Sequence, residues 1–266
     1  MKPSGSSSVM SVRKSPRKTK EERQAKRAAK HMVPLPHDVA RATDPRRGLD
    51  FFPTPPWATR GFIDLALPLV AANFAHQSVW EPCCGEGHMA AVVGERFGRV
   101  HASDVYPHGY GAVGSFIGKG GLDLDIAHCP FRPDWIITNP PFNLAVEVAE
   151  RALGEAREGV ALLVRTLWIE SAERYDLFSR HQPILMATYA ERVPMTEMRW
   201  DPEASSATSY SWIVWVKIGG KTVPACGLPS WQTVIIPPIC RSTYSRGEDV
   251  ARFACRDQVD MFEAAE

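Results

Sequence analysis

The sequence predicts a doubly wound α/β fold built around a mostly parallel sheet. Two observations support this prediction: stretches with strand character alternate with stretches at helical spacing, and several of the strand-like stretches are apolar throughout. Strands that alternate with helices form parallel sheets, and uninterrupted apolar strands are buried on both faces. At 266 residues the chain suits one large domain with appendages.

The elements follow in order along the chain. The Pro-rich segment 53–70 predicts a helix that Thr54 caps, with Phe62, Leu65 and Leu69 at helical spacing. Further helices are expected after the Gly-containing turn of segment 82–98, over 143–156 and over 172–180. Seven strands are expected, at 77–81, 99–104, within 121–126, at 134–138, 159–169, 183–190 and 208–218.

The chain divides into three regions. Residues 1–45 form a basic arm that we expect to be disordered, because it has almost no large apolar residue. Residues 46–220 form the α/β domain, and 221–266 form a Pro-containing extension whose role the sequence does not indicate. Residues 1–31 hold ten Lys and Arg against two Glu, so the arm carries +8 and the rest of the chain −7 of the total of +1. A basic arm on an acidic body suits the binding of a polyanion.

Composition restricts the classes of protein that fit. The six cysteines lack a CxxC pair or metal-ligand spacing, so we expect reduced thiols and no metal site. The chain has no apolar run of about 18 residues and no secretory signal, which predicts a cytoplasmic protein without a membrane span. The oligomeric state is not predicted.

Two strand ends carry residues typical of a nucleoside site. Glu81 closes the strand 77–81, and Gly85 and Gly87 follow in a turn where a ligand can approach the backbone closely. Asp104 closes the next strand, where an acid can accept hydrogen bonds from ribose hydroxyls. No third glycine follows at the dinucleotide spacing, which favours a smaller nucleoside over NAD.

A third strand ends in Asn139-Pro140-Pro141-Phe142. Two prolines cannot continue a central strand, since neither has an N–H for the ladder. They fix a side-chain amide and a free carbonyl at the strand tip, with an aromatic ring beside them. A turn that merely uses Asn and Pro is the structural alternative.

With these motifs, found between residues 51 and 142, the chain resembles the class I S-adenosylmethionine-dependent methyltransferases that methylate amino groups, including N6-adenine DNA methyltransferases. The matching pieces are FFPTPP, EPCCGEGH, ASD, an acid in LDLDI, and TNPPF, in a gamma-like order. The resemblance implies a seven-stranded, Rossmann-like methyltransferase sheet with S-adenosyl-L-methionine as cofactor. It implies these cofactor-binding residues: Thr54 and Glu81 at the methionine part, Gly85 and Gly87 in the lining, Asp104 at the ribose, and Asp123 at the adenine, with Asp125 as a rival for that last role.

In this resemblance Asn139, Pro140, Pro141 and Phe142 are the catalytic residues. An exocyclic amine is a poor nucleophile, and the Asn139 oxygen and the Pro140 carbonyl can accept its two hydrogens while Phe142 stacks on an extruded base. The expected substrate is N6 of adenine in DNA. Cytosine N4, a ribosomal RNA base and a protein glutamine remain alternatives, as does a non-catalytic protein that binds nucleic acid.

DNA is the expected partner, held by the basic arm and the 193–210 loop. Arg192, Arg199 and Trp200 are the candidates there for contacts with bases or phosphates, and an ordinary surface loop is the alternative.

Overall fold

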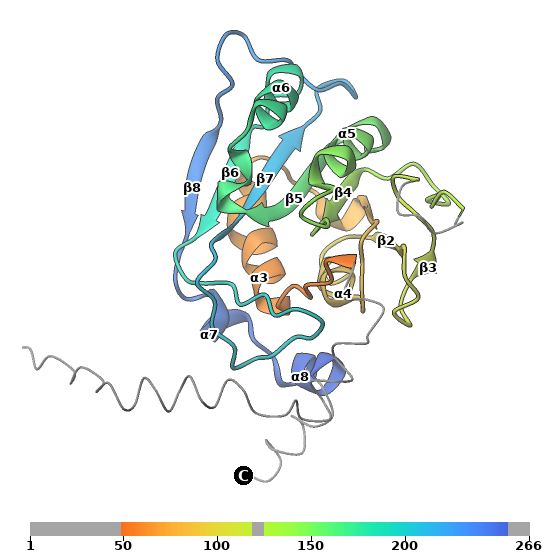
Figure 1. Cartoon of the computed structure of the whole chain (residues 1–266), viewed down its shortest axis with the longest axis vertical. Helices are drawn as coiled ribbons and strands as arrows, with labels where there is room; N and C mark the ends of the chain where they lie inside the picture. Colours follow the sequence, from red (N-terminus) through yellow and green to blue (C-terminus); the bar gives the residue numbers. More distant parts are fainter. Residues whose placement is uncertain (1–48, 119–124, 255–266) are drawn as a thin grey trace, which may run out of the picture. The chain divides into compact units, whose positions relative to one another are not determined.

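A computed structural model describes residues 49–118 and 125–254 of the chain (Figure 1). In this part an eight-stranded sheet has the order β3-β2-β1-β4-β5-β7-β6-β8. Its strands are β1 (Ser78–Glu81), β2 (Arg99–Asp104), β3 (Ala112–Val113), β4 (Trp135–Thr138), β5 (Gly159–Arg165), β6 (Leu185–Tyr189), β7 (Tyr210–Val216) and β8 (Gln232–Ile236).

The sheet is parallel except at β7, which runs antiparallel to both β5 and β6. This confirms the predicted doubly wound, mostly parallel fold, with one strand more than the seven expected. The chain starts in the middle of the sheet at β1, places β2 and β3 on one side, and returns to place β4 and β5 on the other. The strand order therefore reverses between β1 and β4, where ligands of open α/β sheets bind beyond the carboxyl ends of the strands.

Each face of the sheet carries a separate hydrophobic core. Alternate strand residues such as Ile137, Leu163 and Trp212 pack on one face, and their neighbours Ile136, Leu162 and Ile213 pack on the other. The first face is covered by α3 (Pro56–Gly61), α4 (His88–Val93) and α7 (Cys240–Tyr244), and the second by α5 (Ala145–Glu155) and α6 (Ala172–Arg180). Burial on both faces explains why these strands are apolar throughout.

The first helix differs from the prediction in two ways. Thr54 does not cap it: the N-cap residue is Pro55, which makes no side-chain cap hydrogen bond, and Pro56 begins α3. Leu65 and Leu69 are exposed, at 38% and 55%. The reason is that α3 continues as a π-helical turn, η3 (Phe62–Ala66), before the 3₁₀ turn η4 (Leu67–Leu69). A π turn adds a residue to each turn, so the buried face shifts away from an α-helical spacing.

The strand that pairs with β2 also differs from the prediction. The third strand was expected within 121–126, but β3 is the dipeptide Ala112–Val113, paired in parallel with Ser103 and Asp104. Of the predicted segment, residues 121–124 lie outside the described part, and Ile126 forms only an isolated bridge with Ser115. A two-residue strand is too short to show an apolar pattern in the sequence.

The predicted extension 221–266 contributes to the same sheet. β8 pairs in parallel with β6, so the sheet gains a new edge strand. α7 packs on α3 so closely that a Cβ at Gly61 would lie 2.7 Å from the sulfur of Cys240. α8 (Gly247–Phe253) follows. The described part of the extension therefore completes the domain.

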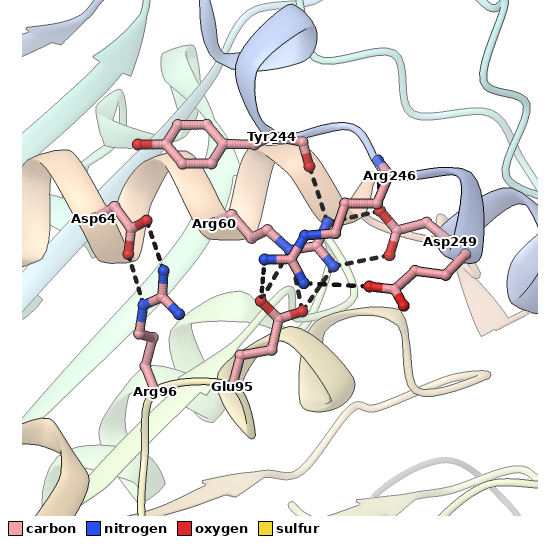
Figure 2. A network of polar contacts seen from close by, with 8 residues as sticks. Arg60, Asp64, Glu95, Arg96, Tyr244, Arg246 and Asp249 are labelled. Carbon is pink, nitrogen blue, oxygen red and sulfur yellow. Dashed lines mark hydrogen bonds and ion pairs between the residues drawn. The ribbon is translucent and has the colours of Figure 1, made fainter.

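Arg60 of α3 ties α7 and α8 to the body (Figure 2). Its guanidinium group donates in bidentate fashion to Asp249, at 2.6 and 2.8 Å, and also to Glu95 and to the carbonyl of Tyr244. Arg246 adds a second ion pair to Glu95 at 3.0 Å. Burial alone would lower the pKa of Arg60, but the hydrogen bonds to Asp249 and Glu95 outweigh it and raise that pKa above its ordinary value.

The arm 1–45 and Asp123 lie outside the described residues. Among the helices of residues 49–118 and 125–254, none is both long and apolar enough to cross a membrane. The same residues contain no group of three or more His, Cys, Asp or Glu that could hold a metal ion.

Candidate functional site

A cavity of about 280 Å³ lies at the point where the strand order reverses. Its wall combines the carboxyl ends of β1, β2 and β4 with the segment that precedes α3. Six of the predicted site residues line it: Thr54, Glu81, Gly85, Asp104, Asn139 and Pro141. The fold therefore brings together residues that are up to 87 positions apart in the sequence.

The glycine turn forms the floor of the cavity beside β1. Gly85 and Gly87 have φ of +51° and +85°, a region that L side chains rarely adopt. A Cβ at Gly85 would lie 2.4 Å from the ring of Phe51, and one at Gly87 would lie 2.5 Å from Tyr110. Glycine is thus required at both positions for conformation and for space, although Gly87 itself is not in the cavity lining.

Asp104 closes β2 and is 8% exposed. One carboxylate oxygen accepts from the N–H of Gly85 at 2.8 Å and the other from the N–H of Tyr106 at 3.0 Å. Burial raises the pKa of Asp104, and these two backbone donors and nearby His108 oppose that rise. Asp104 therefore fixes the glycine turn through its hydrogen bond from Gly85, and the remaining lone pairs of its two oxygens can accept hydrogen bonds from the hydroxyl groups of a ligand.

Glu81 closes β1 and is only 2% exposed. Its Oε2 atom is buried without a hydrogen-bond partner among the described residues. Burial, with a smaller contribution from the charge of Asp104, holds the pKa of Glu81 well above its usual range, while the N–H of Ala90 acts in the opposite direction. A buried acceptor in a cavity wall without a donor is costly, and a cationic ligand group would remove that cost.

Asn139, just after β4, has a fixed orientation. Its Nδ2 group donates to the carbonyl of Phe52 at 2.9 Å, and the sulfur of Met195 lies 3.7 Å away. A carbonyl accepts only from a donor, so the amide oxygen must point the other way. That Oδ1 atom is buried and, within the described part of the chain, has no hydrogen-bond partner.

Phe142 stands beside this amide rather than in the cavity lining. It is half-buried, and its ring centroid lies 5.1 Å from that of Phe52 at a tilt of 43°. The Arg165 guanidinium carbon lies 4.0 Å from the Phe142 ring centroid. Pro140 is buried, and its carbonyl accepts none of the hydrogen bonds found between described backbone groups. The four residues of the motif are therefore clustered, with one ring face already covered.

The remaining predicted residues have different outcomes. Asp123 is outside the described residues, and its rival Asp125 is exposed, with its carbonyl accepting from Ser115. Arg192 and Arg199 are exposed, as a surface role requires. Trp200 is buried at 4% exposure with its ring 6.2 Å from that of His88, so the expectation that it reaches a nucleic acid is wrong.

Sequence reasoning missed several cavity residues. Phe51 covers Gly85 and lies 4.3 Å from the ring of His108, while Phe52 orients Asn139 through its carbonyl. His88 also lines the cavity, and burial lowers its pKa to about 3, so its ring is neutral. The aromatic pair before Pro53 was a visible sequence signal for residues near the cavity. Nothing in the sequence around His88 marks it, because its stacking partner at 4.3 Å is Phe253 of the distant helix α8.

No protein-family profile matches the sequence, and no curated protein does either. Solved structures give low-identity likenesses. The methyltransferase subunit of a type I restriction-modification system from Streptococcus thermophilus aligns at 8% identity and a TM-score of 0.49, over 80% of this chain and 52% of that one. The M protein of the type I restriction enzyme EcoKI aligns at 12% and 0.48, over 77% and 51%.

A protein from Listeria monocytogenes, described as a class I S-adenosylmethionine-dependent methyltransferase, aligns at 13% identity and a TM-score of 0.44, over 87% of this chain and 75% of that one. The chain thus spans about half the length of the two type I subunits. The likenesses include the kind of protein that the motifs resemble, but at this level they establish neither a reaction nor a substrate for this chain.

Proposed function

We propose that the protein transfers a methyl group from S-adenosyl-L-methionine to an exocyclic amino nitrogen, and that its target is N6 of adenine in DNA. The observation that carries this proposal is the Asn139 amide, whose Oδ1 is buried and without a partner among the described residues because Nδ2 is committed to Phe52. An acceptor held in this way at a strand tip suits an amine hydrogen.

The cavity residues fit the proposed cofactor. Glu81 offers a buried carboxylate oxygen that lacks a donor among the described residues, which suits the ammonium of the methionine part. Asp104 has two oxygens at the end of β2 for ribose hydroxyls, and the buried Thr54 lines the same space. When bound, the cofactor would supply an electrophilic methyl group on sulfur.

The chain's own residues would then orient and activate the amine. The Asn139 Oδ1 and the Pro140 carbonyl accept its two hydrogens, which localises the nitrogen lone pair and stabilises the charge that develops on the amine. The bond from Nδ2 to Phe52 and the rigidity of the two prolines keep both acceptors aimed, so little reorganisation is needed. The ring of Phe142 offers a stacking face for a base outside its duplex.

Nucleic acid is supported by charge as well as by the site. The arm of residues 1–31 carries a net charge of +8, and the rest of the chain −7. A tail of this kind supplies phosphate contacts that an acidic body lacks.

Matched substitutions at two asparagines of one turn test the proposal. Asn139→Ala should lower turnover on DNA about 10²-fold or more while cofactor affinity, measured by calorimetry, stays unchanged. Asn143→Ala is the control, because Asn143 lines the same cavity but is exposed. Asp104→Ala should show the opposite pattern and weaken cofactor binding about tenfold or more.

The modified nucleosides identify the target. Digestion of treated DNA followed by mass analysis should show N6-methyladenine, whereas N4-methylcytosine would move the assignment to another amine. If Asn139→Ala turns over within a few-fold of the wild type, the catalytic role of the amide is wrong.

A further inference from the structure

One face of the Phe142 ring is covered by an arginine. The guanidinium carbon of Arg165 lies 4.0 Å from the ring centroid, the distance of a cation–π contact. The same ring has its centroid 5.1 Å from that of Phe52, which belongs to the cavity wall. One face of the Phe142 ring is therefore already in contact with a cation in the free protein.

A second arginine lies at the same edge of the sheet. Arg165 ends β5 and is opposite Tyr210, the first residue of the antiparallel β7. Arg192 follows β6 and hydrogen-bonds the hydroxyl of Ser209, whose carbonyl accepts from Thr166. Arg165 is thus the last residue of β5 and Arg192 lies just after β6, so both belong to the carboxyl ends of these strands, where the chain enters β7.

These two arginines differ from others in the described part of the chain. Arg60, Arg96 and Arg180 each bind a carboxylate within 3.0 Å. Neither Arg165 nor Arg192 has an ion pair with a described carboxylate, and both are exposed. On a body that carries −7 in total, exposed cations without acidic partners leave their charge available to an anionic ligand.

We propose that Arg165 and Arg192 bind the phosphate backbone of a nucleic acid, and that Arg165 leaves the face of Phe142 when the target base stacks there. The base in this inference is the substrate of the proposed methyl transfer, so that part rests on the proposed function. The guanidinium fork matches a phosphate in bidentate geometry, so the displaced side chain gains a stronger partner than the ring.

The relative strengths of the two contacts favour this exchange. An exposed cation–π contact corresponds to about a two- to fivefold factor in an equilibrium constant. Stacking of one base on an aromatic side chain corresponds to about fivefold to a hundredfold. A base can therefore displace the guanidinium, and the displaced group lies beside the strand from which the base was taken.

The test uses the full chain and two probes that separate base from phosphate. The first is 2-aminopurine riboside, which has no phosphate and whose fluorescence falls on stacking. The second is a labelled duplex oligonucleotide of mixed sequence, titrated over a salt series. Arg180→Ala is the control, because Arg180 ends α6 at the opposite edge of the sheet, before β6 begins.

Opposite effects on the two probes are expected for Arg165→Ala. The riboside should bind about two- to fivefold more tightly, since the ring face is open. The slope of log affinity for the duplex against log salt should fall by about 0.9 for the lost phosphate. Arg192→Ala should lower the slope alone, and Arg180→Ala should change neither quantity.

Arg165→Lys gives the same information if the alanine variant does not fold. Lysine keeps the charge but not the planar stacking group, so the slope should hold while the riboside binds more tightly. Weaker riboside binding in both Arg165 variants would overturn the displacement, and an unchanged slope in both alanine variants would overturn the phosphate role in favour of another anionic partner. Neither probe measures methyl transfer. The proposed function is tested separately by the turnover of Asn139→Ala, so the failure of one proposal can be told from the failure of the other.

Discussion

Arg60→Met should destabilise the protein far more than the loss of a neighbouring surface arginine. Arg60 is 4% exposed and holds Asp249, which is 5% exposed, through two hydrogen bonds that span 189 residues of sequence. Without Arg60, the Asp249 side chain keeps, among the described residues, only the weak bond from the N–H of Arg246 at 3.3 Å. An unpaired buried charge of this kind costs about 3–5 kcal/mol.

The magnitude can be converted into a thermal shift. For a domain of this size, 1 kcal/mol lowers the midpoint Tm by about 2–4 °C, so Arg60→Met should lower it by about 6–20 °C. Arg96→Met is the matched control, because Arg96 makes two 3.0 Å bonds to Asp64 but is 43% exposed. Such a surface pair is worth about 0.2–1 kcal/mol, and its loss should move Tm by no more than about 4 °C.

Thermal unfolding followed by circular dichroism, supported by urea titration, measures both variants. Arg60→Met combined with Asp249→Leu should recover part of the loss, since no buried charge is then left unpaired. The Arg60 variant should also bind the cofactor more weakly, because α8 carries Phe253, which stacks on His88 in the cavity wall. Equal Tm shifts for Arg60→Met and Arg96→Met would refute the reasoning.

Two further predictions concern charge. Burial raises the folded-state pKa of Glu81, so its carboxylate lowers the free energy of unfolding as pH rises above the unfolded pKa of about 4.3. Glu81→Gln should therefore raise Tm at pH 7 but not below pH 4, and it should weaken cofactor binding. A lower Tm at both pH values would contradict this prediction. Deletion of residues 1–31 removes ten cations. It should lower the slope of log affinity for DNA against log salt by about 0.9 per lost phosphate contact and leave the rate at saturating DNA unchanged. An identical slope with and without the arm would show that the arm contributes nothing to DNA binding.

The sequence determined the parts of the fold and of the site that local chemistry encodes. The strand 99–104 and the helix 172–180 lie at the predicted bounds, because alternation and helical spacing report burial within a single element. Glu81, Asp104 and Asn139 were each predicted to lie at the end of a strand, and all three line one cavity because parallel strands end at the same edge of a sheet. The two prolines after β4 made the end of that strand certain from composition alone.

Only the tertiary structure decided the features that depend on residues distant in the sequence. No local pattern shows that the Phe52 carbonyl leaves Oδ1 of Asn139 as the available atom, 87 residues away, or that Arg165 covers Phe142. The sequence did not indicate a role for the extension after residue 220. β8 is a largely exposed edge strand with weak apolar alternation, and α8 is held by an ion pair with Arg60, which lies far away in the sequence. Sequence periodicity records how much of an element is buried, whereas the identity of the partner that buries it is settled only when the chain folds.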